Sequence, residues 1–208
     1  MSDNATCRGL ITGAVLAGGR ARRMGGEDKG LVQLGGRTMI EYALDALKQQ
    51  TSEILINANR NLDRYRHYGW PVVEDKVGDF SGPLAGMASV LAHATTPYVL
   101  MVPCDSPMLP RDLARRLYLA LVRTNAQITV AHDGERMQPV FALLQRKLLS
   151  SMEEYLAEGG RKIDRWYATH RLHSVDFSDK PEAFVNVNTP EEREELGQKL
   201  LDADQQQS

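Results

Sequence analysis

The sequence predicts an α/β protein of three layers, with helices on both faces of a mostly parallel sheet. First, short apolar runs alternate with helical patterns along the first 130 or so residues. Second, these runs are almost continuously apolar, as strands are when both faces of their sheet are covered. Third, helical patterns lie between successive runs, where crossover connections of a parallel sheet would be.

Five candidate strands are short, several of them β-branched, and each is bounded by Gly, Pro, Asn or Asp. They are residues 11–17, 53–58, 71–74, 98–102 and 128–131. Because parallel strands with right-handed crossovers end at a common edge, the loops that follow them should meet there. Those loops contain the segments GGRARRMGGEDKG, NANR, DKVGD and PCDSP.

Three helices are expected between these strands. In TMIEYALDALKQQ, Thr38 can cap the helix and Glu41 can complete a capping box. The apolar stripe of this helix is Ile40, Ala43, Leu44 and Leu47. The segment PLAGMASVLAHA begins with Pro83, which suits a first helical turn. The segment RDLARRLYLALVR places Leu113, Leu117, Ala120 and Leu121 on one face.

The last third of the chain has a different pattern. AQITVAHDGERMQPVFALL predicts two strands around a turn at residues 133–135, and HSVDF and AFVNV predict a second pair. We expect some of these antiparallel strands to extend the edge of the sheet. Residues 190–199 predict a final helix.

Length and composition limit the class of protein. A chain of 208 residues favours a single domain over residues 1–208, with loose ends at 1–9 and about 200–208. The net charge of −2 gives no overall basic field for nucleic acid. No run approaches the roughly 18 apolar residues of a membrane helix, and the first residues do not resemble a signal peptide. We expect a cytoplasmic monomer, and Cys7 and Cys104 predict neither a disulfide framework nor a zinc site.

The glycine-rich segment LAGGRARRMGGEDKG occupies residues 16–30. It is not a Walker loop, because Lys29 is followed by Gly30, and it contains no G-x-G-x-x-G. Glycine backbone N–H groups together with arginine and lysine side chains can nevertheless bind phosphate. The alternative is a flexible, solvated turn.

Asp105 follows a predicted central strand, at the edge where open α/β sheets bind ligands. An aspartate there is either a cap or turn residue or a ligand of Mg²⁺. A phosphate-binding loop at the same edge needs a cation to offset its ligand's charge, so the two features together favour nucleotide chemistry.

Five segments in order resemble the bacterial molybdenum cofactor guanylyltransferases, from residue 12 to about residue 195. They are LAGGRARRMGGEDK, NANR, EDKVGDFSGPLAGM, PCDSP and AFVNVNTPEE. The first alone is typical of nucleotidyltransferases in general. The resemblance implies one Rossmann-like domain that transfers GMP from GTP to the terminal phosphate of molybdenum-molybdopterin with Mg²⁺ and releases pyrophosphate. It also implies a molybdenum-insertion protein and molybdoenzyme-specific chaperones as partners.

The resemblance assigns roles to individual residues. Lys29 would contact phosphate and Asp105 would bind Mg²⁺ and GTP, so that these two are the catalytic residues. The other expected nucleotide contacts are Leu16, Ala17, Gly18, Gly19, Arg23, Asn57, Asp75 and Gly82. Related enzymes carry a second metal carboxylate near the end of the chain, where this sequence has Asn186 and Asn188.

The acceptor side of the site stays open at this point. Candidates are residues 132–139 and the basic segment with Arg161, Lys162 and Arg165, although a solvated helix start explains the latter equally well. Gly82 and Gly86 could let a purine approach, or could make a turn and a close helix contact. Trp70 and Trp166 could stack on a pterin or serve as packing residues, and Cys104 is expected to be a buried filler.

Two other functions compete with guanylyl transfer. A cytidylyl or sugar-phosphate nucleotidyltransferase would use the same scaffold, but with other base-contact loops. A nucleotide sensor or cofactor-delivery chaperone without catalysis would need only the binding loop, and the presence of both Lys29 and Asp105 argues against it.

Overall fold

The computed structural model describes residues 7–18, 28–76 and 82–185, together with 192, 194, 196–198 and 200. Four residues with predicted roles, Gly19, Arg23, Asn186 and Asn188, therefore lie outside the described residues. The main feature is a seven-stranded sheet. Its strands are β1 (Ile11–Leu16), β4 (Glu53–Asn57), β5 (Val72–Val73), β6 (Tyr98–Pro103), β7 (Ile128–His132), β8 (Met137–Gln145) and β9 (Leu172–Asp176).

The strand order is β5-β4-β1-β6-β8-β7-β9. β1 pairs in parallel with β4 and with β6, whereas β8 runs antiparallel to both β6 and β7. The mostly parallel α/β fold is thus confirmed, but the antiparallel strand lies inside the sheet and not at its edge. Because β9 is parallel to β7, six of the seven strands end at the same edge of the sheet.

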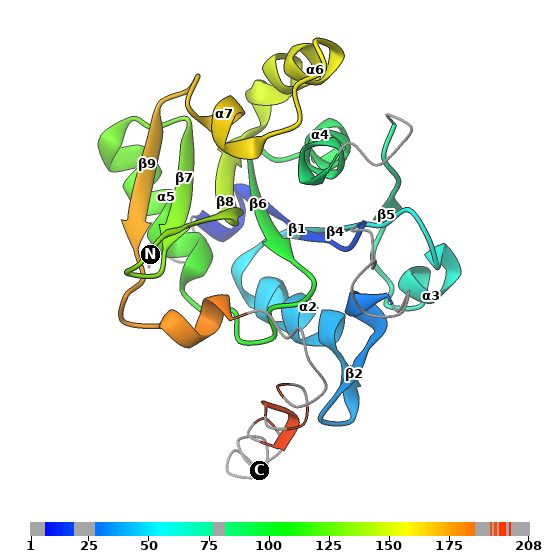
Figure 1. Ribbon diagram of the computed structural model, residues 1–208. Helices are drawn as coiled ribbons and strands as arrows, with labels where there is room; N and C mark the ends of the chain where they lie inside the picture. Colours follow the sequence, from blue (N-terminus) through cyan, green and yellow to red (C-terminus); the bar gives the residue numbers. More distant parts are fainter. Residues whose placement is uncertain are drawn as a thin grey trace.

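Helices cover both faces of this sheet (Figure 1). α4 (Pro83–His93), α6 (Leu149–Ala157) and α7 (Ile163–Tyr167) lie on one face, and α2 (Met39–Gln50) and α5 (Leu113–Thr124) lie on the other. α3 (Leu62–Arg66) follows β4, and β2 (Gln33–Leu34) and β3 (Arg37–Thr38) form a small hairpin below the sheet. The described residues also contain three 3-10 turns: η1 (Lys29–Leu31), η2 (Arg146–Leu148) and η3 (Pro181–Phe184).

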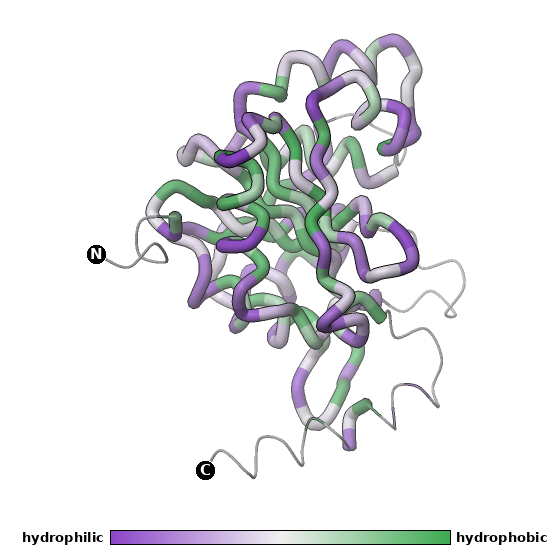
Figure 2. The backbone as a smooth tube through the Cα atoms, turned by 90° about the vertical axis from the view of Figure 1, so that its left-hand side faces the viewer, coloured by the Kyte–Doolittle hydropathy of each residue, from purple (hydrophilic) through white to green (hydrophobic). Residues whose placement is uncertain are grey.

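The two faces of the sheet bury two separate apolar clusters, which appear as the green centre of the molecule in Figure 2. Ile40 and Leu47 of α2 belong to one cluster, and Leu84 and Met87 of α4 belong to the other. Both predicted helix starts are confirmed, since Pro83 opens α4 and the Thr38 N–H donates to Glu41 Oε2 at 2.6 Å. The predicted stripe of α2 is buried throughout.

Two local predictions are wrong. HSVDF does not pair with the described part of AFVNV, residues 183–185, because β9 joins β7 in parallel and Ala183 and Phe184 lie in η3. Phe184 packs edge-on against Phe141, with ring centroids 4.9 Å apart, so core packing decides the conformation there. On α5, Ala114 is buried in place of Ala120, since the buried face is turned slightly from the predicted one.

The chain ends also differ in part from expectation. Cys7 is 1% exposed, and the Arg8 guanidinium donates to the carbonyls of Lys48 and Thr51, so these two residues are anchored. Residues 192, 194, 196–198 and 200 are helical, as predicted for the C-terminal segment. Leu196 and Leu200 pack against the small hairpin. Among the described residues, no helix has the length and apolarity needed to cross a bilayer.

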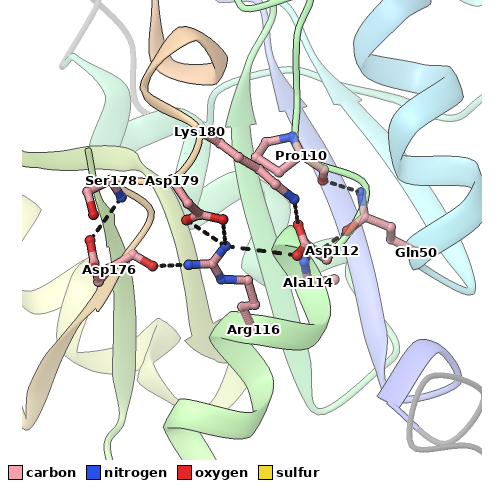
Figure 3. A network of polar contacts seen from close by, with 9 residues as sticks. All are labelled: Gln50, Pro110, Asp112, Ala114, Arg116, Asp176, Ser178, Asp179 and Lys180. Carbon is pink, nitrogen blue, oxygen red and sulfur yellow. Dashed lines mark hydrogen bonds and ion pairs between the residues drawn. The ribbon is translucent and has the colours of Figure 1, made fainter. Parts of the chain in front are cut away.

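A polar network fastens the segment after β9 to the start of α5 (Figure 3). Arg116 of α5 binds the Asp179 carboxylate at 2.9 and 3.0 Å, and its guanidinium lies 3.9 Å from the centre of the Phe177 ring. Asp112 forms an ion pair with Lys180 at 2.8 Å. These contacts join parts of the chain that are more than 60 residues apart.

Candidate nucleotide site

The described parts of the loops predicted to converge lie at the carboxyl edge of the sheet. The Ala17 N–H donates to the Asn57 carbonyl at 2.8 Å, and the Cys104 N–H donates to the Leu16 carbonyl at 3.3 Å. The ends of β1, β4 and β6 are therefore held side by side. The predicted backbone contacts at residues 16–18 lie at the centre of this edge.

Lys29 and Asp105 form an ion pair across this edge, with 2.9 Å between Nζ and Oδ2. Lys29 is the first residue of η1, and Asp105 follows β6 after Cys104. The side chains are 29% and 14% exposed, so the pair is accessible from solvent. The resemblance gave these residues separate roles, and the structure brings them into direct contact.

Asp75 is oriented by two asparagines, one at the end of β4 and one in the loop between β4 and α3. Asn57 Nδ2 donates to Asp75 Oδ1 at 2.7 Å and to the Val73 carbonyl at 3.1 Å. Asn59 Nδ2 donates to Asp75 Oδ2 at 2.8 Å, and its Oδ1 accepts the Asp75 N–H at 2.8 Å. The predicted residues Asn57 and Asp75 thus form one unit. Asn59 was not predicted, although its position within NANR was the available signal.

Two glycines allow the asparagines to lie this close to the backbone. A Cβ atom at Gly86 would lie 2.2 Å from Asn57 Oδ1, and one at Gly18 would lie 2.8 Å from Asn59 Nδ2. The space beside Gly86 is therefore filled by Asn57, which favours close helix packing over purine contact at that position. Gly82 has φ +76° and precedes Pro83, so it makes the turn that starts α4.

A buried carboxylate that sequence reasoning missed lies directly before Lys29. The Asp28 side chain is 4% exposed and accepts hydrogen bonds from the Tyr65 hydroxyl at 2.6 Å and from Asn61 Nδ2 at 2.9 Å. Arg60 Nε lies 3.5 Å from its Oδ2. Burial, with the nearby Cys104 and Asp28, raises the pKa of Tyr65 far above its ordinary value, so the hydroxyl stays protonated and donates.

Several other candidate residues pack in the core or hold the backbone. Trp166 is 1% exposed and lies in the core, as a packing residue does. The Arg161 guanidinium donates to the carbonyls of Leu156 and Gly160 and so fastens the turn after α6. Cys104 is buried, as expected for a filler, and burial raises the pKa of its thiol.

The hairpin turn after β7 is held by its own aspartate. Asp133 Oδ1 accepts the backbone N–H groups of Glu135 and Arg136, both at 2.8 Å. The hydrogen bonds from Arg136 and Glu135 lower the pKa of Asp133 to about 2. Within the acceptor candidate 132–139, this aspartate therefore shapes the turn.

Solved structures of nucleotidyltransferases share this fold. One is molybdopterin-guanine dinucleotide biosynthesis protein A from Archaeoglobus fulgidus, with a TM-score of 0.73 at 19% identity, covering 94% of this chain and 99% of that one. Another is a nucleotidyl transferase from Methanothermobacter, with a TM-score of 0.70 at 20% identity, covering 96% of this chain and 99% of that one. The architecture is thus the Rossmann-like fold of the nucleotidyltransferases.

Sequence comparison narrows this class to a family. Residues 13–175 match the family model of the MobA-like NTP transferase domain. The molybdenum cofactor guanylyltransferase of Shewanella species strain MR-4 is 52% identical over 190 residues, which is 91% of this chain and 96% of that protein. The chain therefore belongs to the MobA-like family of NTP transferases, and the resemblance predicted from the five segments is confirmed.

Proposed function

We propose that this chain transfers GMP from GTP to the terminal phosphate of molybdenum-molybdopterin, forming the molybdopterin guanine dinucleotide cofactor and releasing pyrophosphate. The observation that carries this proposal is the 52% identity, over 91% of the chain, to a molybdenum cofactor guanylyltransferase. The grouping of Lys29, Asp75 and Asp105 at one edge of the sheet supports it.

The reaction needs no protein nucleophile. A phosphate oxygen of the acceptor attacks the α-phosphorus of GTP, the new P–O bond forms, and the bond between the α-phosphorus and its bridging oxygen breaks with release of pyrophosphate. Because both reactants are anions, positioning and charge neutralisation supply most of the rate. An ammonium such as that of Lys29, about 4 Å from a phosphate oxygen, gives on the order of 4 kcal/mol of gross attraction at an effective dielectric near 20.

Asp105 fits a magnesium ion that is shared with the nucleotide. Its partly exposed carboxylate is a hard oxygen ligand, and in the structure it already binds a cation, the Lys29 ammonium at 2.9 Å. Magnesium commonly takes one or two protein carboxylates and completes its shell with phosphate oxygens and water. When bound, Mg²⁺ supplies positive charge at the phosphates, and Lys29 is then available to a phosphate oxygen.

We further propose that GTP lies along the edge formed by residues 16–18, with Asn57 and Asp75 on one side of it and Lys29 on the other. Asp75 presents a carboxylate whose orientation is fixed by two amides, which suits a donor-bearing group of the nucleotide. Of the two glycines considered for contact with the purine base, Gly82 and Gly86, only Gly82 remains a candidate. The cytoplasmic location, the monomeric state, the single-domain organisation and the partner proteins stay predictions of the sequence.

The test is nucleotide-dependent release of pyrophosphate. The protein is incubated with Mg²⁺, molybdenum-loaded molybdopterin and each NTP in turn, and we expect turnover with GTP. Turnover with CTP and not GTP would contradict the proposal in favour of cytidylyl transfer. Binding of GTP with no pyrophosphate release would favour a sensor or delivery protein.

The Asp105→Ala variant tests the metal site. We expect it to lose magnesium-dependent turnover while its circular dichroism spectrum and thermal midpoint stay close to those of the wild type. Full activity of this variant would remove Asp105 from the proposed metal site.

A further inference from the structure

The position of Lys29 depends on the residue that precedes it. Asp28 and Lys29 are adjacent, and the Leu31 N–H donates to the Asp28 carbonyl at 2.9 Å, which closes the η1 turn that Lys29 begins. The Asp28 side chain is almost completely buried at 4% exposure. A buried carboxylate is costly unless hydrogen-bond donors surround it, so its partners fix where this part of the backbone lies.

Those partners come from a different part of the chain. Asn61 Nδ2 and the Tyr65 hydroxyl lie 2.9 and 2.6 Å from the two Asp28 oxygens. Asn61 has φ +51°, a left-handed conformation that asparagine tolerates, and it directly precedes α3. Tyr65 is 0% exposed, and its ring packs beside that of Tyr68 at 6.4 Å.

Gly30 provides the space that this arrangement needs. A Cβ atom at Gly30 would lie 2.7 Å from the Tyr65 hydroxyl oxygen and 3.3 Å from Cys104 Cβ. The glycine after Lys29 therefore lets the Tyr65 hydroxyl reach Asp28 below the η1 turn. Asp28, Lys29 and Gly30 are consecutive, so one short segment carries both the buried anchor and the exposed ammonium.

We propose that Tyr65 and Asn61 are positioning residues for nucleotidyl transfer, which act through Asp28 to hold Lys29 where it meets Asp105 and the phosphates. This inference rests on the proposed function. It gives the segment from the end of β4 to α3, residues 57–65, two roles, because Asn57 and Asn59 of the same segment orient Asp75. This segment thus fixes both the lysine side and the Asp75 side of the site.

Tyr65→Phe removes one hydroxyl and leaves the ring in the core. We expect the rate of GTP turnover to fall about tenfold, as loss of a hydrogen bond to a charged group commonly causes. Tyr68→Phe is the matched control, since its hydroxyl bonds to Thr38 at 2.8 Å and does not contact Asp28. The control should change turnover less than twofold.

The discriminating measurement is a double-mutant cycle. In a Lys29→Ala background, Tyr65→Phe should have less than a twofold further effect on turnover, because its effect passes through Lys29. A full tenfold further loss in that background would overturn the proposal, since a general structural defect would act independently of Lys29. Thermal midpoints of all variants are compared in parallel.

Asn61→Gly keeps the left-handed backbone and removes the amide. Asn125 has the same φ of +51° at the end of α5, far along the chain, so Asn125→Gly is its matched control. We expect a several-fold loss of turnover for Asn61→Gly only. Equal effects of the two variants would contradict the positioning role.

A structural readout separates this inference from the proposed function. Crystal structures of the wild type and Tyr65→Phe should show the Lys29–Asp105 contact in the former and its loss or lengthening in the latter. An unchanged contact in Tyr65→Phe would overturn the inference, whatever reaction the wild type catalyses. A wild type that transfers no GMP would refute the proposed function instead.

Discussion

Two lysine–aspartate pairs of this protein have nearly the same geometry and different surroundings. Lys29 lies 2.9 Å from Asp105, and Lys180 lies 2.8 Å from Asp112. Both join distant segments, 76 and 68 residues apart, and both lysines are about equally exposed, at 29% and 35%. Distance and lysine exposure alone therefore do not distinguish the pair proposed to act in catalysis.

Their places in the fold differ. Lys180 and Asp112 belong to a network in which Arg116 and Asp179 balance the remaining charge, on the flank of α5 (Figure 3). Lys29 and Asp105 lie where parallel strands end, with the buried Asp28 anchor behind them. Topology and the groups behind a pair indicate whether it is suited to a ligand or to fastening the chain.

Removal of each lysine gives the largest predicted contrast. Lys29→Ala should lower turnover by about 10² to 10³, because it removes the cation proposed to face the reacting phosphates. Lys180→Ala should leave turnover within twofold of the wild type and lower stability slightly. Steady-state kinetics measure the first effect and urea unfolding the second. Similar turnover losses for the two variants would contradict the distinction between the pairs.

A change in packing at the carboxyl edge of the sheet, where Gly86 contacts Asn57, should have an intermediate effect. Gly86→Ala would place a methyl group against Asn57, so overpacking should lower the free energy of unfolding by about 2 kcal/mol and weaken GTP binding. The matched control is Gly9→Ala, because a Cβ at Gly9 would meet no atom within 4 Å. Denaturant titration and calorimetry check both. If Gly86→Ala lowers the free energy of unfolding no more than Gly9→Ala does, the carboxyl edge of the sheet is loosely packed around Asn57.

The stabilisation from the Lys180–Asp112 ion pair should depend slightly on pH. Burial opposes ionisation of Asp112, but the hydrogen bond from Lys180 and the charges of Lys180 and Arg116 outweigh it and lower its pKa. The stabilisation is therefore present above the unfolded-state pKa of about 3.9 and is lost as pH falls through the lower folded-state value.

Asp112→Asn measures this effect. This substitution should lower the free energy of unfolding by about 1 kcal/mol or less at pH 7, since exposed ion pairs contribute little. The loss should become smaller in acid and in high salt. Urea unfolding of the variant and the wild type at several pH values checks this. If the loss of free energy of unfolding stays constant down to pH 2, it comes from lost neutral hydrogen bonds and not from the ion pair.

The arrangement of loops could be predicted from sequence because it follows from strand order and direction. Apolar runs that end near Gly18, Asn57 and Asp105 were enough to place these residues at one edge of the sheet. In the structure, Asn57 also contacts Asp75. The capping box of α2 was also visible, since Thr38 and Glu41 have the required spacing. Such features depend on local sequence or on a general rule of chain topology.

The Asp28 anchor could not be predicted in the same way. Asp28, Asn61 and Tyr65 meet only through tertiary packing, and no spacing in the sequence links them. Likewise, nothing in the alternation of β8 tells that this strand inserts between β6 and β7. The 3-10 turn at Ala183 and Phe184 follows from aromatic packing in the core, which overrides an extended pattern.

Because β8 lies between β6 and β7 in the sheet, one neighbour of β6 is synthesised well after β6 itself. β6 ends at Pro103, but its second neighbour, β8, is completed only at Gln145. During synthesis, the chain therefore passes through a stage in which β6 has an unpaired edge that carries Leu100 and Met101, both 0% exposed in the finished protein. An unpaired apolar edge favours association between chains, so the nascent protein is most prone to aggregate before β8 arrives.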